Sequence, residues 1–233
     1  MVLGTLFSQI YLWRYVKKEV YSIKIDKDVI IQNIKPILIL FIPVLSFSIY
    51  KVMDKIMLGN ISNYTQVGYY NNAEKIINIP MGIITALGAV MLPRMSSLIA
   101  EGENRKSENY IIMSIKLVTI LASAISFGLM GISSIFTPIF FGNGFSACTP
   151  IIILLSVTVF FISWANVVRT QFLIPNHYDK VYIYSTILGA IINLILNLIF
   201  IPKYQAVGAA IGTVAAEFTL MFVQVFSIRK RVN

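Results

Sequence analysis

Long apolar stretches, broken only by isolated polar residues, alternate with short polar segments along most of the chain. A helix needs about 20 mostly apolar residues to cross the hydrocarbon core of a bilayer. Six stretches after residue 35 reach that length, and charged residues, proline or glycine separate them. The pattern therefore predicts an all-α, polytopic membrane protein with six full transmembrane helices. We expect these helices at 36–59, 66–100, 109–137, 151–174, 181–201 and 206–228.

The remaining segments flank this six-helix region. Residues 1–16 are apolar but short for a membrane span, so we interpret them as the end of a transmembrane helix whose beginning is missing from the sequence. Residues 17–35 are rich in lysine and form a predicted connector. The predicted organisation is therefore a helix end, a connector, a transmembrane lobe at 36–228 and a tail at 229–233.

Composition supports the membrane assignment. The chain is 57% hydrophobic and 12% charged, whereas soluble domains carry about 25% charged residues. The net charge of +9 would suggest nucleic acid as the partner of a soluble protein. In a membrane protein the same charge is typical of cytoplasmic loops, which collect lysine and arginine. We therefore expect a lipid bilayer as the partner, and no nucleic acid.

The distribution of basic residues also predicts the orientation of the chain in the cell membrane. Most of these residues fall in segments 17–35, 101–108 and 175–180 and at the C-terminus. These segments are therefore predicted to be cytoplasmic under the positive-inside rule.

Ionisable residues interrupt the first two predicted spans. Lys51, Asp54 and Lys55 lie in the first span, and Glu74 and Lys75 lie in the second. Each charge at the centre of a membrane helix costs about 2.5–3.5 kcal/mol on insertion scales. Such residues are retained when they face a neighbouring helix or a water-filled cavity. The two spans therefore predict a polar cavity inside the membrane.

Other polar residues follow helical spacing and extend the candidate site. Asn71, Lys75 and Asn78 recur at i, i+4 and i+7 and share one helix face. Asn193 and Asn197 are also four residues apart, on the fifth predicted span. Single ionisable residues in the fourth and sixth spans complete the set of cavity candidates: Arg169 and Glu217.

A purely structural interpretation of the charged residues is also open. Lys51 and Asp54 of the first span, and Glu74 and Lys75 of the second, could belong to ion pairs that lock the two spans together without touching a substrate. Periodicity defines the face on which a residue lies but does not identify its partner, so the sequence leaves both interpretations standing.

Several segments resemble the bacterial polysaccharide flippases, which transport lipid-linked oligosaccharides and belong to the multidrug/oligosaccharidyl-lipid/polysaccharide exporter superfamily. The resemblance rests on three segments: IYKVMDKIMLGNIS (49–62), VGYYNNAEKI (67–76) and VMLPRMSSL (90–98). It extends more loosely to SWANVVRTQFLIPN (163–176) and AVGAAIGT (206–213). The family fold has two lobes of six helices, and the resemblance places this chain in the second lobe. It implies that an N-terminal lobe, or a partner chain, completes the transporter.

The resemblance implies a substrate consisting of an oligosaccharide on undecaprenyl pyrophosphate. Lys51, Lys55, Lys75 and Arg169 are then the expected partners of the pyrophosphate, and the asparagines are the expected partners of sugar hydroxyls. Asp54 and Glu74 would hold the lysines charged, or would bind H⁺ or Na⁺ in a coupled cycle. No other cofactor is expected.

Other functions are compatible with a polytopic membrane protein. A multidrug exporter of the same superfamily is the first alternative, although the lysines of the first two spans disfavour cationic drugs. A membrane-embedded polysaccharide polymerase or a scaffold is the second. With a single cysteine, Cys148, and a single histidine, His177, the sequence shows no metal site and no nucleophile–base constellation. We therefore expect a transporter and not an enzyme.

Overall fold

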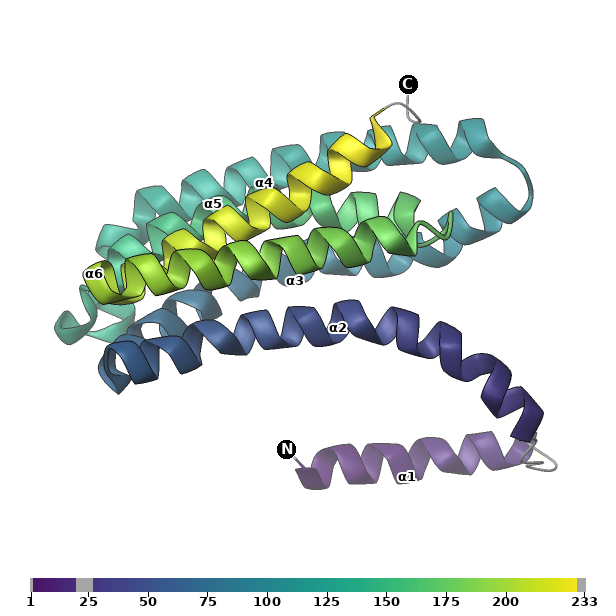
Figure 1. Ribbon diagram of the computed structural model, residues 1–233, viewed down its shortest axis with the longest axis horizontal. Helices are drawn as coiled ribbons and strands as arrows, with labels where there is room; N and C mark the ends of the chain where they lie inside the picture. The colour runs from purple at the N-terminus through teal and green to yellow at the C-terminus, as the bar shows by residue number, and fades with distance from the viewer. Residues whose placement is uncertain (1, 20–26, 230–233) are drawn as a thin grey trace. The chain divides into compact units, whose positions relative to one another are not determined.

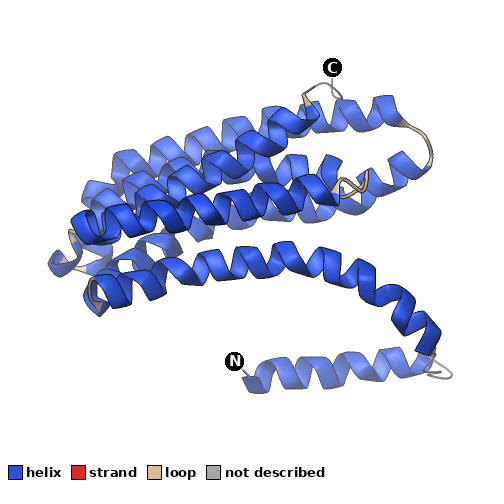
Figure 2. Cartoon of the chain, viewed as in Figure 1, coloured by secondary structure: helices blue, strands red, loops and turns tan. Residues whose placement is uncertain are grey.

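The computed structural model describes residues 2–19 and 27–229, and these residues form helices joined by short turns, with no strand among them (Figure 2). The chain divides into two compact units at residues 1–39 and 40–233. Helix α1 (Val2–Glu19) lies in the first unit, and α2 (Lys27–Ile61) crosses from the first unit into the second. The predicted connector and tail fall partly on positions 20–26 and 230–233, which lie outside the described residues. The connector's last residues belong to α2.

The second unit is a bundle of long helices (Figure 1). The turns between its helices are short. Asn63 fixes the start of α3, because its side chain accepts a hydrogen bond from the Gln66 backbone N–H (3.0 Å). Gly102 and Gly142, at the ends of α3 and α4, adopt positive φ angles that favour glycine. After α2 the unit contains α3 (Tyr64–Ala100), α4 (Asn104–Phe141), the short 3₁₀ helix η1 (Asn143–Phe145), α5 (Cys148–Val168), the π-helix η2 (Arg169–Leu173) and α6 (Asp179–Ile228).

Helix α6 folds back on itself at Gln205. A straight helix of its 50 residues would be about 75 Å long. Gln205 instead has φ 53° and ψ −127°, and the second half of α6 runs back beside the first (Figure 1). Contacts between the halves confirm the antiparallel arrangement, because the Gln224 side-chain N–H donates to the Ser185 hydroxyl at 3.0 Å. The break matches the boundary predicted between the last two spans.

Helix α5 occupies the centre of the bundle. It packs against α3, α4 and α6. In the most apolar 18-residue stretch of the helix formed by α5 and η2, 61% is buried inside the bundle. In the corresponding stretches of α3, α4 and α6, at most 33% is buried. The outer helices expose large apolar side chains such as Ile79, Phe127 and Ile139, as expected for surfaces that face lipid.

Four helices of the described chain are long and apolar enough to cross a membrane: α3, α4, the continuous α5–η2 helix and α6. The expected all-helical membrane fold is therefore confirmed, but the expected count of six full spans is not. The difference arises in part because α6 is counted once although it contains two of the predicted spans.

Candidate functional site

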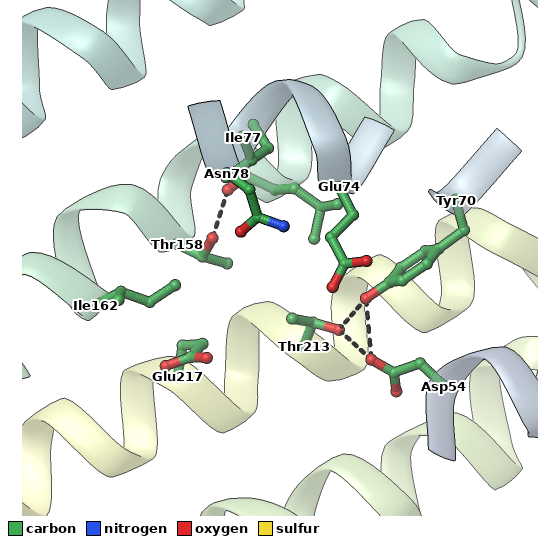
Figure 3. Close-up of a pocket in the computed structure, with 10 residues that line it drawn as sticks. Asp54, Tyr70, Glu74, Ile77, Asn78, Thr158, Ile162, Thr213 and Glu217 are labelled. Atoms are coloured by element: carbon green, nitrogen blue, oxygen red, sulfur yellow. Dashed lines mark hydrogen bonds between the residues drawn. The ribbon is translucent and has the colours of Figure 1, made fainter. Parts of the chain in front are cut away.

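Asp54, near the end of α2, is the most deeply placed charged side chain of the candidate set, with 2% of its surface exposed. Its Oδ2 accepts hydrogen bonds from the hydroxyls of Tyr70 (2.9 Å) and Thr213 (3.0 Å), as Figure 3 shows. Its Oδ1 accepts a hydrogen bond from the side-chain N–H of Asn197 at 2.5 Å. These three donors are uncharged, and they come from α2's neighbours α3 and α6. Asp54 therefore ties three helices together through a carboxylate.

Two asparagines extend this arrangement along the first half of α6. The side-chain N–H of Asn197 also donates to Asn193 Oδ1 at 3.1 Å. Both asparagines are at most 1% exposed, yet Asn197 Oδ1 has no hydrogen-bond partner. Buried polar atoms without a hydrogen-bond partner are rare, so such an atom indicates a place where a water or an ion can bind. We call the group formed by these residues the Asp54 cluster: Asp54, Tyr70, Asn193, Asn197 and Thr213.

The chemistry of the Asp54 cluster suits a small hard cation or a proton. Its carboxylate, hydroxyl and amide oxygens are of the type that binds such ions. The backbone carbonyl of Ala209 lies beside them, because it accepts a hydrogen bond from Thr213 at 3.0 Å. Soft-metal sites need other ligands, and in the described part of the chain no three His, Cys, Asp or Glu side chains are placed so that they could hold one metal ion together.

Glycine at position 212 permits the approach of the two halves of α6. A Cβ atom added at Gly212 would lie 2.3 Å from Asn197 Oδ1. That distance is far below van der Waals contact, so any larger residue would push Asn197 away from Asp54. Gly208 and Gly212 lie four residues apart on this half of α6, a spacing of small residues that permits close helix packing.

A narrow polar pocket adjoins the Asp54 cluster. Its volume is about 40 Å³, which is room for one or a few water molecules. Figure 3 shows Asp54, Glu74 and Glu217 following one another along it, with Asn78 between the two glutamates. Ten residues line the pocket: Asp54, Tyr70, Glu74, Ile77, Asn78, Leu155, Thr158, Ile162, Thr213 and Glu217.

Glu74 also forms an ion pair that joins α2 to α3. Lys55 Nζ lies 2.7 Å from Glu74 Oε2, and the two side chains are 32% and 19% exposed. The structural interpretation expected ion pairs that lock these two helices together, and the structure forms one such pair, with Lys55 as the partner of Glu74. Asp54 takes uncharged partners instead. The side chain of Lys51 lies outside the described part of the structure.

A second, wider pocket continues from the first towards the other end of α5. Its volume, measured in the same way, is about 250 Å³. Arg169 lies in it, at the start of the π-helix η2, a type of helix that often occurs at functional sites. The Arg169 guanidinium carbon is 5.7 Å from the centre of the Tyr182 ring, within cation–π range. Both pockets share three lining residues: Asn78, Ile162 and Glu217.

The other predicted site residues lie on the same helix face but outside both pocket linings. Asn71 is half-buried on α3, and Lys75 is exposed. Sequence reasoning missed Tyr70 and Thr213, although each lies four residues before a predicted site residue, Glu74 and Glu217 respectively. That i, i+4 relation was the available signal. Helical spacing alone gave no reason to prefer these two residues over other polar neighbours.

Comparisons with known proteins place the chain among the flippases. The family model described as "Lipid II flippase MurJ" matches residues 1–233. A "Putative O-antigen transporter" of Escherichia coli (strain K12) is 30% identical over 190 residues, which cover 79% of this chain and 45% of that protein. A "Probable low-salt glycan biosynthesis flippase" of Haloferax volcanii is 27% identical over 164 residues, covering 70% of this chain and 34% of the relative.

The fold and the matched lengths agree with this similarity. A solved structure titled "Lipid II flippase MurJ, inward closed conformation" superposes with a TM-score of 0.77 at 16% sequence identity, covering 97% of this chain and 50% of that one. The "Capsular polysaccharide biosynthesis protein CapF" of Staphylococcus aureus is 24% identical over 232 residues, covering 95% of this chain and 57% of the relative. The chain therefore spans about half the length of the relatives it matches, and the match corresponds to their C-terminal half.

Proposed function

This chain belongs to the lipid II flippase MurJ family, and from that premise we propose that it forms one lobe of a flippase for lipid-linked oligosaccharides of the cell surface. The substrate is an oligosaccharide on undecaprenyl pyrophosphate, moved across the cell membrane during polysaccharide synthesis. The relatives named for O-antigen, glycan and capsule synthesis support this substrate class. The proposed role is transport and not catalysis.

The observation that carries the proposal is the Asp54 cluster, a buried polar cluster inside an apolar helical bundle. A buried carboxylate with uncharged partners has a high free-energy cost in a membrane, and Asp54 is 2% exposed. In a scaffold, an apolar residue at this position would stabilise the bundle as well as the carboxylate does, or better. A transporter does gain, because a carboxylate that binds and releases a cation can drive a change of conformation. We assign this coupling role to the Asp54 cluster, with H⁺ or Na⁺ as the cation.

The exposed part of the same helix face suits the substrate. Lys75 and Asn78 are exposed on α3, and Asn71 lies one turn before Lys75. An ammonium group binds a pyrophosphate, and amides bind sugar hydroxyls. We propose that this face of α3 lines the substrate path, and that the Lys55–Glu74 ion pair holds α2 beside it.

The proposed topology has six spans in the lobe at 36–228. Helix α2 supplies the first span, α3 to α5 supply the next three, and the two halves of α6 supply the last two. The substrate path lies between this lobe and a second lobe, supplied by an N-terminal region or by a partner chain, because alternating access needs two bodies that move against each other.

Replacing Asp54 tests the proposal in the cell. In a strain that carries this gene and makes a surface polysaccharide, we expect Asp54→Asn to lower surface polysaccharide about tenfold or more, the effect of losing one charged ligand worth about 1.5–3 kcal/mol. Lipid-linked oligosaccharide should accumulate inside the cell. Asn60→Ala, at an exposed position of the same helix, is the matched control. Normal polysaccharide after deletion of the whole gene would refute the proposed function.

A further inference from the structure

We propose that the coupling cation reaches the Asp54 cluster through the inside of the lobe, along the two adjoining pockets, with Glu217 as its intermediate ligand. This inference rests on the proposed coupling role of the Asp54 cluster and adds a route and a second ligand to it. Asn71 and Lys75, which we assign to the substrate path, line neither pocket, whereas Asn78 borders both the substrate path and the route of the cation.

The first step of the argument is the continuity of the pockets. Asn78, Ile162 and Glu217 line both pockets, so the narrow pocket beside Asp54 adjoins the wider one and only these side chains lie between them. Along α3 the lining runs from Tyr70 to Thr85, which is about 22 Å of helix at 1.5 Å per residue. The path therefore covers most of the thickness of a bilayer core of about 30 Å.

The second step concerns charge. Among the described residues that line the narrow pocket there are three carboxylates and no lysine, arginine or histidine. Lys55 compensates the charge of one of them, Glu74, from outside the lining. Carboxylates in a water-poor pocket raise the local concentration of cations strongly, since their field is focused by the apolar walls. The narrow pocket therefore selects cations over anions.

The third step is the polar lining beyond Glu217. Asn166 is 4% exposed and lines the wider pocket, yet its Oδ1 has no hydrogen-bond partner. Thr85 and Thr186 add hydroxyls to the same lining. A buried amide oxygen that lacks a protein partner is the kind of group that a water or a hydrated cation satisfies. The wider pocket thus provides oxygen ligands between Glu217 and the Arg169 end.

Glu217 lies at the junction because it belongs to both linings. It is 4% exposed and lies one helical turn after Thr213, a member of the Asp54 cluster. Arg169 lines the wider pocket with it. The wider pocket thus holds one positive and one negative side chain, and Glu217 is the carboxylate that a cation entering this pocket meets before Asp54.

Labelling of an introduced cysteine tests the route in the membrane-embedded protein. The background is Cys148→Ala, which removes the chain's single thiol. Ile162→Cys then places a thiol at the junction of the pockets. The probes are 2-aminoethyl methanethiosulfonate, a small cation, and 2-sulfonatoethyl methanethiosulfonate, an anion. Rates are divided by those of Asn143→Cys, at an exposed position of η1. Ile153→Cys, on α5 outside both linings, is the control for an apolar location.

We expect the normalised rate at Ile162→Cys to favour the cationic reagent by about tenfold or more, the range of a focused field. Glu217→Gln should reduce that preference severalfold, whereas Glu101→Gln, at an exposed position, should leave it unchanged. Labelling at Ile162→Cys no faster than at Ile153→Cys would overturn the route. A preference that Glu217→Gln leaves intact would overturn the role of Glu217.

The same labelling identifies the cation. If Na⁺ occupies the path, replacing K⁺ by Na⁺ slows the cationic reagent at Ile162→Cys and not at Asn143→Cys. If a proton occupies it, acidification from about pH 8 to about pH 6 slows labelling more at Ile162→Cys than at Asn143→Cys. An absence of both effects would overturn cation occupancy. Because labelling does not depend on polysaccharide export, its failure is distinguishable from failure of the proposed function.

Discussion

At the scale of single residues, the side chain of Asp54 shows the limit of sequence analysis. Its charge inside an apolar stretch predicted a polar site, because that property is visible locally. Its partners could not be predicted, since Asn197 and Thr213 are 143 and 159 residues away in the sequence. Local spacing favoured a lysine on the same helix, whereas the fold supplies neutral donors from α6.

Thr213 allows the Asp54 cluster to be weakened by a single hydroxyl. Thr213→Val keeps the shape of the side chain and removes the donor to Asp54. We expect it to lower the free energy of unfolding by about 1–3 kcal/mol, since a buried carboxylate loses a partner. Thermal unfolding of the purified protein in detergent measures this change.

Two variants control for this substitution. Thr213→Ser retains the hydroxyl and should restore most of the stability. Thr219→Val removes a hydroxyl on the same helix that bonds only to the Ala215 backbone, and we expect a smaller loss. Equal effects of Thr213→Val and Thr219→Val would contradict the importance of the bond to Asp54.

At the scale of helices, the sequence predicted well where helices occur along the chain. It predicted poorly which helices pack against each other. Boundaries followed from the length of apolar runs, and the break between the last two spans was predicted close to Gln205. The central position of α5 was not predicted. Its sequence is apolar on all sides, which is typical both of a lipid-facing helix and of a helix buried among others. Only the packed bundle distinguishes the two.

The contact between the halves of α6 can be tested at Gly212. We expect Gly212→Ala to destabilise the protein by about 1–3 kcal/mol, because the added methyl group overlaps Asn197 and must displace it. Gly128→Ala is the matched control, because a Cβ atom there meets nothing within 4 Å. That control should be neutral or slightly stabilising, by up to about 1 kcal/mol. Comparable melting temperatures for the two variants would show that the close approach at Gly212 is unimportant.

At the scale of the whole molecule, charge separates the two ends of the bundle. Figure 1 shows the α3–α4 and α5–α6 connections and the last turn of α6 at one end of the second unit, and the α4–α5 connection and the fold of α6 at the other. The first end carries most of the basic residues, including Arg105, Lys106, Lys180 and Arg229, whereas Lys203 lies at the second. The sequence predicted this grouping, because loop charge needs no knowledge of packing.

The charge asymmetry predicts which end faces the cytoplasm. We expect a reporter that is active only outside the cytoplasm, such as alkaline phosphatase, to be inactive when fused after Gly102 or Arg229. The same reporter should be active when fused after Asn143, because the segment around it lacks charged residues. A fluorescent reporter active only in the cytoplasm should give the opposite pattern. Reversed activities would invert the proposed orientation.

The fold of α6 at Gln205 also has a consequence for biogenesis. The two halves are joined through a single residue with non-helical backbone angles, so there is no loop that could wait on the far side of the membrane while the second half is synthesised. The first half ends in buried Asn193 and Asn197, and the second half carries their neighbours Gly212 and Thr213. We therefore expect the two halves to leave the translocon together as a preformed hairpin, with Asn193 and Asn197 of the first half already shielded from lipid by the returning helix.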